Sequence, residues 1–175
     1  MKKYNVLIAG AGLAGLSLAK ELAGTGLSVL VIDKKKSAGQ VKYYSSGTFM
    51  NPDEYGIPRE FLHGIEKAVF CSKNLSCSKN ISDCYVIDRV KLYHWMEKTA
   101  LKDDNIKIRY GCEVKGEKHG FGKITGINYL DHGRNVEASA DIYVDCTGTS
   151  AVLGRKAGLT PEKSVMALGV EHLVP

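Results

Sequence analysis

The sequence has few cysteines, and they do not form the usual disulfide or metal-binding patterns. It contains five, an odd number with no Cys-x-x-Cys pair: Cys71, Cys77, Cys84, Cys112 and Cys146. This count and irregular spacing argue against a disulfide framework and indicate a reducing, cytosolic compartment. The intervals of five and six residues that follow Cys71 and Cys77 match no standard zinc or iron–sulfur motif. We therefore expect no metal site and small, buried cysteine side chains.

Long apolar runs and concentrated basic charge are also missing. Outside residues 4–19, no apolar run approaches the roughly 20 residues that a membrane-spanning helix requires. The net charge is only +5, and the one basic run is Lys34-Lys35-Lys36, so we expect no nucleic-acid partner. A chain of 175 residues, of which 44% are hydrophobic and 25% charged, has the size and composition of about one globular domain.

The apolar run near the start has two interpretations. Two lysines followed by residues 4–19 are similar to the charged and apolar parts of a secretion signal. However, the run contains Gly10, Gly12 and Gly15 in the spacing Gly-x-Gly-x-x-Gly, and a helical pattern continues where a signal would end at a cleavage site. A second strand-like run, LSVLVID, follows at residues 27–33. This order of strand, glycine turn, helix and strand favours a nucleotide-binding motif.

Each glycine of this motif has a mechanical purpose in a dinucleotide fold. Gly10 permits the tight turn, Gly12 lets a pyrophosphate approach the backbone, and Gly15 lets the helix pack close to the strand. The start of the helix presents free amides and the positive end of its dipole to the phosphates. Asp33 lies 18 residues after Gly15, at the end of the second strand, where its carboxylate can bind the ribose hydroxyls. A dinucleotide is therefore the expected ligand.

The residues after Asp33 leave the choice of dinucleotide open. The carboxylate disfavours the 2′-phosphate of NADP, although Lys34 and Lys35 do not exclude it, and NAD and FAD both fit the first 33 residues. A simple NAD-binding domain would next alternate strands and helices, whereas residues 37–60 contain several glycine and proline breakers. A loop of this length in a compact domain indicates a functional segment. We expect the later elements to be strands at 66–72 and 84–89, a helix at 89–102, a strand at 106–114, a hairpin at 122–138 and a strand at 140–150.

Four stretches, in this order, resemble the FAD-dependent geranylgeranyl reductases, which belong to the large flavoprotein superfamily that also contains the aromatic hydroxylases. They are GAGLAG with Asp33, CYVIDRVKLYHWMEKTA at 84–100, GCEVKG at 111–116 and VDCTGTSAVLGRKAGL at 144–159. The first stretch is shared by many proteins, but all four together are considerably more specific. The resemblance implies an α/β, Rossmann-like FAD/NAD(P)-binding fold with a parallel sheet and an inserted β-hairpin or small sheet. It also implies FAD as the cofactor.

In this resemblance the four stretches surround the cofactor. The glycine turn and Asp33 hold the ADP half, Arg89 reaches the flavin phosphates or the ribityl chain, and the backbone of Val114 meets the adenine. Thr147 and Gly148 form a second turn near the phosphates. The implied cofactor-binding residues are Gly10, Ala11, Gly12, Leu13, Ala14, Gly15, Asp33, Lys34, Arg89, Val114, Thr147 and Gly148.

Two positions depart from the family pattern. Many relatives carry Cys-Gly in the loop over the flavin, where this chain has Ser45, Ser46 and Gly47, so a role for that cysteine does not carry over. The hydroxylases of the superfamily usually have Asp-Gly at the second turn, where this chain has Thr147 and Gly148. The neutral hydroxyl favours the reductases over the hydroxylases.

Members of this family are about twice as long as this chain. The resemblance therefore implies that residues 1–175 are the N-terminal part of an FAD-binding domain, with residues 37–60 as the flavin-side loop and the C-terminal substrate domain absent. Residues 164–175 resemble the first strand that crosses into that domain. A fragment, a split-gene product and a shortened homologue all agree with this sequence.

The resemblance implies an oxidoreductase that uses FAD to reduce the C=C bonds of an isoprenoid lipid. Its partners would be a prenyl lipid and a reduced electron donor, in the cytoplasm or at the membrane periphery. No catalytic residue is assigned, because Tyr43, Tyr44 and Ser46 lie in the expected loop but a tyrosine pair in an irregular segment more often only packs. Another FAD-dependent monooxygenase or dehydrogenase, and a non-catalytic dinucleotide-binding fragment, are the alternatives.

Three of the residues in these stretches also have plain structural explanations. Arg89 can pair with a surface acid instead of a cofactor, Trp95 can belong to the core, and Asp145 can simply end its strand.

Overall fold

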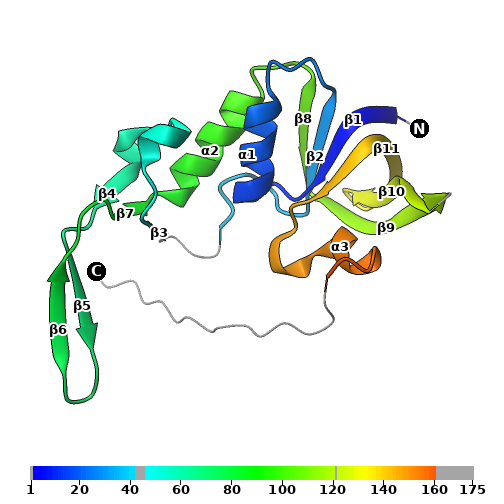
Figure 1. Ribbon diagram of the computed structural model, residues 1–175. Helices are drawn as coiled ribbons and strands as arrows, with labels where there is room; N and C mark the ends of the chain where they lie inside the picture. Colours follow the sequence, from blue (N-terminus) through cyan, green and yellow to red (C-terminus); the bar gives the residue numbers. More distant parts are fainter. Residues whose placement is uncertain (1, 42–45, 121, 161–175) are drawn as a thin grey trace.

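The computed structural model describes residues 2–41, 46–120 and 122–160 and is built on a six-stranded sheet (Figure 1). Its strands are β1 (Lys2–Ala9), β2 (Val29–Asp33), β8 (Ile106–Tyr110), β9 (Cys112–Gly120), β10 (Lys123–Asp131) and β11 (Arg134–Asp145). Their order across the sheet is β8-β2-β1-β11-β10-β9. The first four strands in this order run parallel, and β10 is antiparallel to both of its neighbours. This is the expected Rossmann-like α/β fold.

Two helices, α1 (Leu13–Leu22) and α2 (Arg89–Ala100), lie side by side on one face of the parallel strands (Figure 1). Successive strand residues point to opposite faces, so Ile8 of β1 and Val31 of β2 join Leu16 and Met96 of the helices in one hydrophobic core. All five residues of β2 are buried, as expected for a parallel strand that is covered on both faces.

A second core covers the other face of the sheet. Leu7 and Leu30, the alternate residues of β1 and β2, pack with Ile127 and Tyr129 of β10 and with Leu153 of α3 (Val152–Lys156). Each side of the parallel strands is therefore closed by a different part of the chain. Within the described residues, no helix is both long and apolar enough to cross a membrane.

Strand β11 takes part in both kinds of pairing. Its first residues pair antiparallel with β10 up to Ala138, and from Ala138 to Asp145 it pairs parallel with β1. The second strand of the hairpin expected at 122–138 and the strand expected at 140–150 therefore belong to one continuous strand, β11, which begins after the turn at residue 133. The expected strand at 106–114 is, in contrast, divided at Gly111, which has a φ of +67°, into β8 and β9 at opposite edges of the sheet.

Residues 46–88 form smaller units beside the helices. A three-stranded sheet has the order β3-β7-β4, built from β3 (Gly47–Thr48), β4 (Leu62–Gly64) and β7 (Tyr85–Ile87). Two short 3-10 turns, Pro52–Tyr55 and Arg59–Phe61, lie in the second half and at the end of the irregular loop expected at residues 37–60. A separate hairpin of β5 (Lys67–Cys71) and β6 (Ser76–Asn80) extends away from the rest of the molecule (Figure 1).

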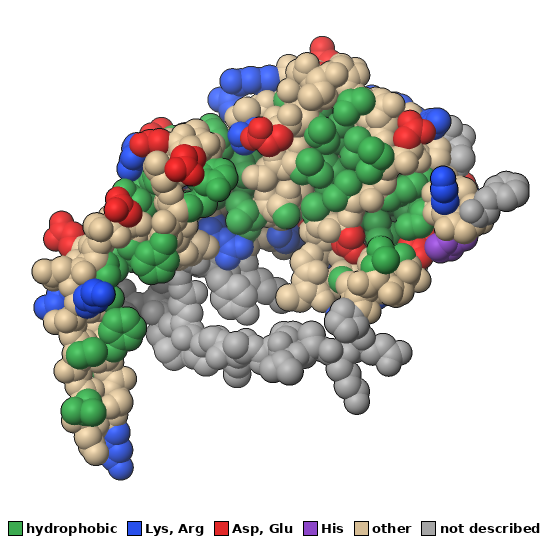
Figure 2. Space-filling model, in the orientation of Figure 1, with side chains coloured by type: hydrophobic (Ala, Val, Ile, Leu, Met, Phe, Trp, Pro, Cys, Tyr) green, Lys and Arg blue, Asp and Glu red, His purple; other side chains and the backbone are tan. Residues whose placement is uncertain are grey.

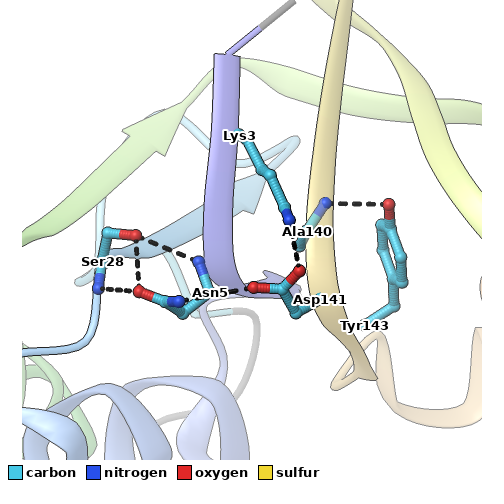
Figure 3. Close-up of polar contacts among 6 residues, drawn as sticks. All are labelled: Lys3, Asn5, Ser28, Ala140, Asp141 and Tyr143. Carbon is cyan, nitrogen blue, oxygen red and sulfur yellow. Dashed lines mark hydrogen bonds and ion pairs between the residues drawn. The ribbon is translucent and has the colours of Figure 1, made fainter.

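Polar side chains join β1, β11 and the residue before β2 at the end opposite the glycine turn (Figure 3). The Asn5 side chain accepts hydrogen bonds from the amide and the hydroxyl of Ser28, both at 2.9 Å, and donates to Asp141 at 3.4 Å. Lys3 forms an ion pair with Asp141 at 2.7 Å, and the backbone amide of Ala140 donates to the Tyr143 hydroxyl at 2.8 Å. The backbone ladder sets the register of β1 and β11, and this network adds side-chain contacts between them at the end opposite the glycine turn.

Candidate dinucleotide site

The turn between β1 and α1 requires glycine at two of its three glycine positions. Gly10 has a φ of +105°, and a Cβ there would lie 2.3 Å from the carbonyl oxygen of Cys146. A Cβ at Gly15 would lie 1.8 Å from the carbonyl oxygen of Gly10. These contacts bring α1 against the end of β1 and against the turn that follows β11. Gly10 and Gly15 are thus fixed by packing inside the protein.

Gly12 differs because a Cβ there would meet no heavy atom within 4 Å. It is the N-cap residue of α1, and no side chain in the described part of the chain caps the first amides of the helix. The free amides and the helix dipole therefore face open space, which is the environment that a phosphate requires. The open space at Gly12 agrees with the expectation that a ligand approaches the backbone closely at this glycine.

A first cavity of about 270 Å³ opens at the carboxyl ends of β1, β2 and β11. Its wall is made by the glycine turn, the residues after β2, the start of β9 and the turn after β11. In doubly wound sheets ligands bind at this edge. Seven of the expected cofactor-binding residues line it: Gly10, Gly12, Asp33, Lys34, Val114, Thr147 and Gly148.

Asp33 lines this cavity and also holds its rim together. Its carboxylate accepts hydrogen bonds from the backbone amides of Ala11 and Lys35, each at 2.7 Å, and the residue is only 9% exposed. Each carboxylate oxygen has a further lone pair for a ligand hydroxyl. The sequence indicates the ligand contact but not the link between the glycine turn and the end of β2. Ala11 therefore contributes through its amide, although it does not line the cavity.

Asp145, at the end of β11, organises the second turn. Its carboxylate accepts from the amide and hydroxyl of Thr147 at 2.9 and 2.6 Å, and from the amides of Leu153 and Gly154 at 2.8 Å. Burial works to raise its pKa, but the Thr147 hydroxyl and the three amides outweigh burial, and the pKa lies below the ordinary 3.8. Asp145 is therefore more than the end of a strand. An acid two residues before a threonine, just ahead of a short helix, is the sequence signal for this cap.

A second cavity of about 220 Å³ lies between α1, α2 and the segment from residue 46 to 57. Leu13 and Arg89, expected at the cofactor, line this cavity instead of the first one. The guanidinium of Arg89 donates to the Tyr93 hydroxyl at 2.7 Å and lies 5.5 Å from the centre of the Tyr93 ring. Trp95 also lines this cavity, with the Lys20 ammonium 5.5 Å from its ring. Gly12 and Leu13 are consecutive, so the first turn of α1 borders both cavities.

The remaining residues that the sequence analysis singled out do not line the first cavity. Ala14 and Gly15 are in α1 and line neither cavity. Ser46 lines the second cavity, whereas Tyr43, Tyr44 and Ser45 are outside the described residues.

Two cysteines contribute to the first cavity as uncharged side chains. Burial, with a hydrogen bond to Asp131, raises the pKa of Cys112 to about 11, and burial also raises the pKa of Cys146. All five cysteines are free, but Cys71 and Cys77 are exposed rather than buried as expected. Within the described residues no group of three His, Cys, Asp or Glu side chains could hold a metal ion.

The fold and this site define a dinucleotide-binding domain: a parallel sheet, a glycine turn with an uncapped helix, and an acid at the end of the second strand. Comparison with known proteins identifies the family to which this dinucleotide-binding domain belongs. Residues 5–163 match the family described as FAD dependent oxidoreductase, and the chain belongs to this family. FAD is therefore the cofactor of the domain.

Relatives of known name include two groups. The digeranylgeranylglycerophospholipid reductase of Haloferax volcanii is 26% identical over 174 residues, which are 97% of this chain and 42% of the relative. Protein FixC of Azotobacter vinelandii is 28% identical over 196 residues, covering 99% of this chain and 44% of that protein. A geranylgeranyl bacteriochlorophyll reductase-like structure from Thermoplasma acidophilum superposes with a TM-score of 0.78 at 21% identity, over 95% of this chain and 44% of the other. The chain spans less than half the length of these relatives.

Proposed function

We propose that residues 1–175 form the N-terminal FAD-binding part of a flavin-dependent reductase that saturates C=C bonds of a prenyl lipid. The observation that carries this proposal is the pair of cavities that meet at the first turn of α1, because FAD is long enough to need an adenosine site and a flavin site. The names of the reductase relatives support the prenyl lipid as substrate.

The first cavity fits the ADP half of FAD. The open side of Gly12 and the free amides of α1 suit the pyrophosphate. The lone pairs of Asp33 suit the ribose hydroxyls, with Lys34 beside them, and the backbone of Val114 suits the adenine. At the opposite wall, Thr147 and Gly148 would complete the phosphate site from the second turn. Ala11, Ala14 and Gly15 support this site through the geometry of the turn and helix.

The second cavity fits the flavin side. Arg89, held by Tyr93, would meet the phosphates or the ribityl chain at the end nearest Leu13. When bound, FAD supplies hydride transfer, while the residues of this chain bind and orient it. The described residues present no group that we assign as the proton donor. A reduced electron donor and the rest of a longer protein are the remaining partners that we propose.

The five free cysteines support a reducing compartment, and we place the protein in the cytoplasm at the periphery of the membrane that supplies a prenyl lipid. A second candidate function is another FAD-dependent oxidoreductase, because protein FixC matches this chain as well as the reductases do. Oxidation of the reduced flavin on addition of a prenyl lipid, in a protein that includes the substrate domain, distinguishes the two candidates.

The cofactor site is tested by the visible spectrum of the purified 175-residue chain after incubation with FAD and desalting. We expect flavin absorption near ~450 nm to be retained. Gly12→Val should fold normally, because nothing lies within 4 Å of its Cβ, but should weaken FAD binding at least about tenfold by filling the side that faces the pyrophosphate.

Gly64→Val is the matched control, since a Cβ at Gly64 also meets nothing within 4 Å and Gly64 lies in β4, outside both cavities. A wild-type chain that retains no flavin, or a Gly12→Val variant that binds FAD like the control, would refute the proposed site.

A further inference from the structure

Tyr93 is a buried polar residue at the wall of the second cavity. It lies on α2, is only 2% exposed, and packs in the same hydrophobic core as Leu16 and Met96. Its ring and its hydroxyl contact two cationic side chains from different parts of the chain. Because Tyr93 is already covered by the described residues, further parts of a longer protein could only bury it more.

The first of the two cations is Arg89, one turn earlier on α2. Its guanidinium donates to the Tyr93 hydroxyl at 2.7 Å and lies 5.5 Å from the centre of the ring. Residues four positions apart lie on the same side of a helix, and a charged donor strengthens the hydrogen bond. Tyr93 therefore orients Arg89 where both residues line the second cavity.

The second cation is Lys35, in the basic run after β2. It is half-buried, whereas the other two lysines of that run are exposed, and its ammonium lies 5.9 Å from the centre of the Tyr93 ring. This distance is within the range of a cation–π interaction. The backbone of Lys35 is held on both sides, since its amide donates to Asp33 and its carbonyl accepts from the Gly111 amide, each at 2.7 Å. Lys35 lines the first cavity and forms no ion pair with any described residue.

One buried ring thus brings together two cations, one at each cavity. Lysine and arginine side chains are scattered over the face that Figure 2 shows, whereas Lys35 and Arg89 both lie within 6 Å of the centre of a ring in the core. Two like charges held this close repel each other. A tyrosine, unlike an acid, holds them without neutralising them. An anionic group that binds between the cavities would lower this repulsion.

We propose that Tyr93 is a positioning residue for the cofactor, which holds Lys35 at the first cavity and Arg89 at the second so that both cations meet one bound dinucleotide. The identity of the ligand rests on the proposed function, whereas the cluster of three side chains is a feature of the structure itself. The ring reaches Lys35, and the hydroxyl binds Arg89. The two contacts can be separated, because phenylalanine keeps the ring and loses the hydroxyl.

The test is titration of the 175-residue chain with FAD, followed by flavin fluorescence, and with ADP, followed by calorimetry. We expect Tyr93→Phe to weaken FAD binding about fivefold, through the loss of the hydrogen bond to Arg89, and to leave the affinity for ADP unchanged. Tyr93→Leu removes both contacts and should weaken ADP binding as well, about threefold. A residue with only a structural role would change both affinities together.

A double-mutant cycle shows whether the hydroxyl acts through Arg89. In an Arg89→Met background, Tyr93→Phe should have no further effect on the affinity for FAD. Tyr129→Phe is the matched control, because Tyr129 is 3% exposed, its hydroxyl raises the pKa of the neighbouring Arg109, and it lines neither cavity. This control should bind FAD and ADP like the wild type.

Four results would overturn the role of Tyr93: an unchanged FAD affinity in Tyr93→Phe, an equal loss of FAD and ADP affinity in that variant, an additive effect in the Arg89→Met background, or an equal loss in the control. A wild-type chain that binds no FAD would refute the proposed function together with this role. A wild-type chain that binds FAD no better than Tyr93→Phe would refute the role of Tyr93 alone.

Discussion

At the scale of single residues, Asp145 controls the shape of the second turn through its four hydrogen bonds. In Asp145→Asn the amide can accept only at one oxygen, and its NH₂ group would face backbone donors. We expect the free energy of unfolding to fall by about 1–3 kcal/mol and FAD to bind more weakly, because Thr147 and Gly148 line the first cavity. Urea unfolding and flavin titration measure the two effects.

Asp141→Asn is the matched control, since Asp141 lies on the same strand but its ion pair with Lys3 and its hydrogen bond from Asn5 (Figure 3) are exposed. Its effect on stability should be the smaller one, and its flavin affinity should be unchanged. If both variants lose flavin affinity equally, the second turn has no special part in binding.

The lowered pKa of Asp145 also gives its contribution a defined pH dependence. A carboxyl group whose pKa is lower in the folded than in the unfolded state stabilises the fold fully above the unfolded pKa of about 3.9. That stability is lost as the pH falls through the folded value. The difference in melting temperature between the wild type and Asp145→Asn should therefore be constant from about pH 5 to 7 and shrink below about pH 4. A difference that grows in acid would contradict the assigned hydrogen bonds.

At the scale of elements, the contact of α1 with β1 depends on Gly15. A Cβ would lie 1.8 Å from a backbone oxygen, which no side-chain rotation relieves. We expect Gly15→Ala to lower the free energy of unfolding by about 2–4 kcal/mol, at or beyond the upper range for overpacking, and to reduce FAD binding as α1 shifts. Gly12→Ala has open space at its Cβ, so its free energy of unfolding should lie within about 1 kcal/mol of the wild-type value. Chemical denaturation compares the two, and equal stabilities would contradict the close packing.

The same elements show how much the sequence could predict. The β1-turn-α1-β2 unit was predictable because each step has a local signal: an apolar strand, glycines at fixed spacing and an acid at the strand end. Strand β6, SCSKN, has no apolar alternation and forms only through pairing with β5. The continuity of β11 was likewise not predictable, since it depends on a change of partner at Ala138.

In the site, too, features with a local sequence signal were predictable and features that depend on contacts between distant elements were not. The glycine turn, Asp33 and the second turn could be assigned to one edge of the sheet, because parallel strands bring their carboxyl ends together. That Leu13 and Arg89 line a separate cavity depends on how α1 packs on α2, a contact between elements that are distant in the sequence. The individual contacts of all these residues with FAD are still predictions.

At the scale of the whole molecule, ligand binding should raise stability, because the first cavity joins the ends of β1, β2 and β11 with the start of β9. FAD at a hundredfold excess over its Kd adds about 2.7 kcal/mol, which raises the melting temperature by about 5–10 °C for a chain of this size. ADP, which we propose to bind only at the first cavity, should give a smaller positive shift. Differential scanning fluorimetry checks both values. If neither FAD nor ADP changes the melting temperature, the first cavity is not a nucleotide site.

Because Gly12 borders one cavity and its neighbour Leu13 the other, the two halves of a dinucleotide would bind as a tethered pair. Once the adenosine half is seated, the flavin half reaches its own cavity at a high effective concentration set by the short pyrophosphate link. The intact cofactor then gains far more affinity than either half shows alone. Selection acting on the residues of one cavity would thus change the occupancy of the other.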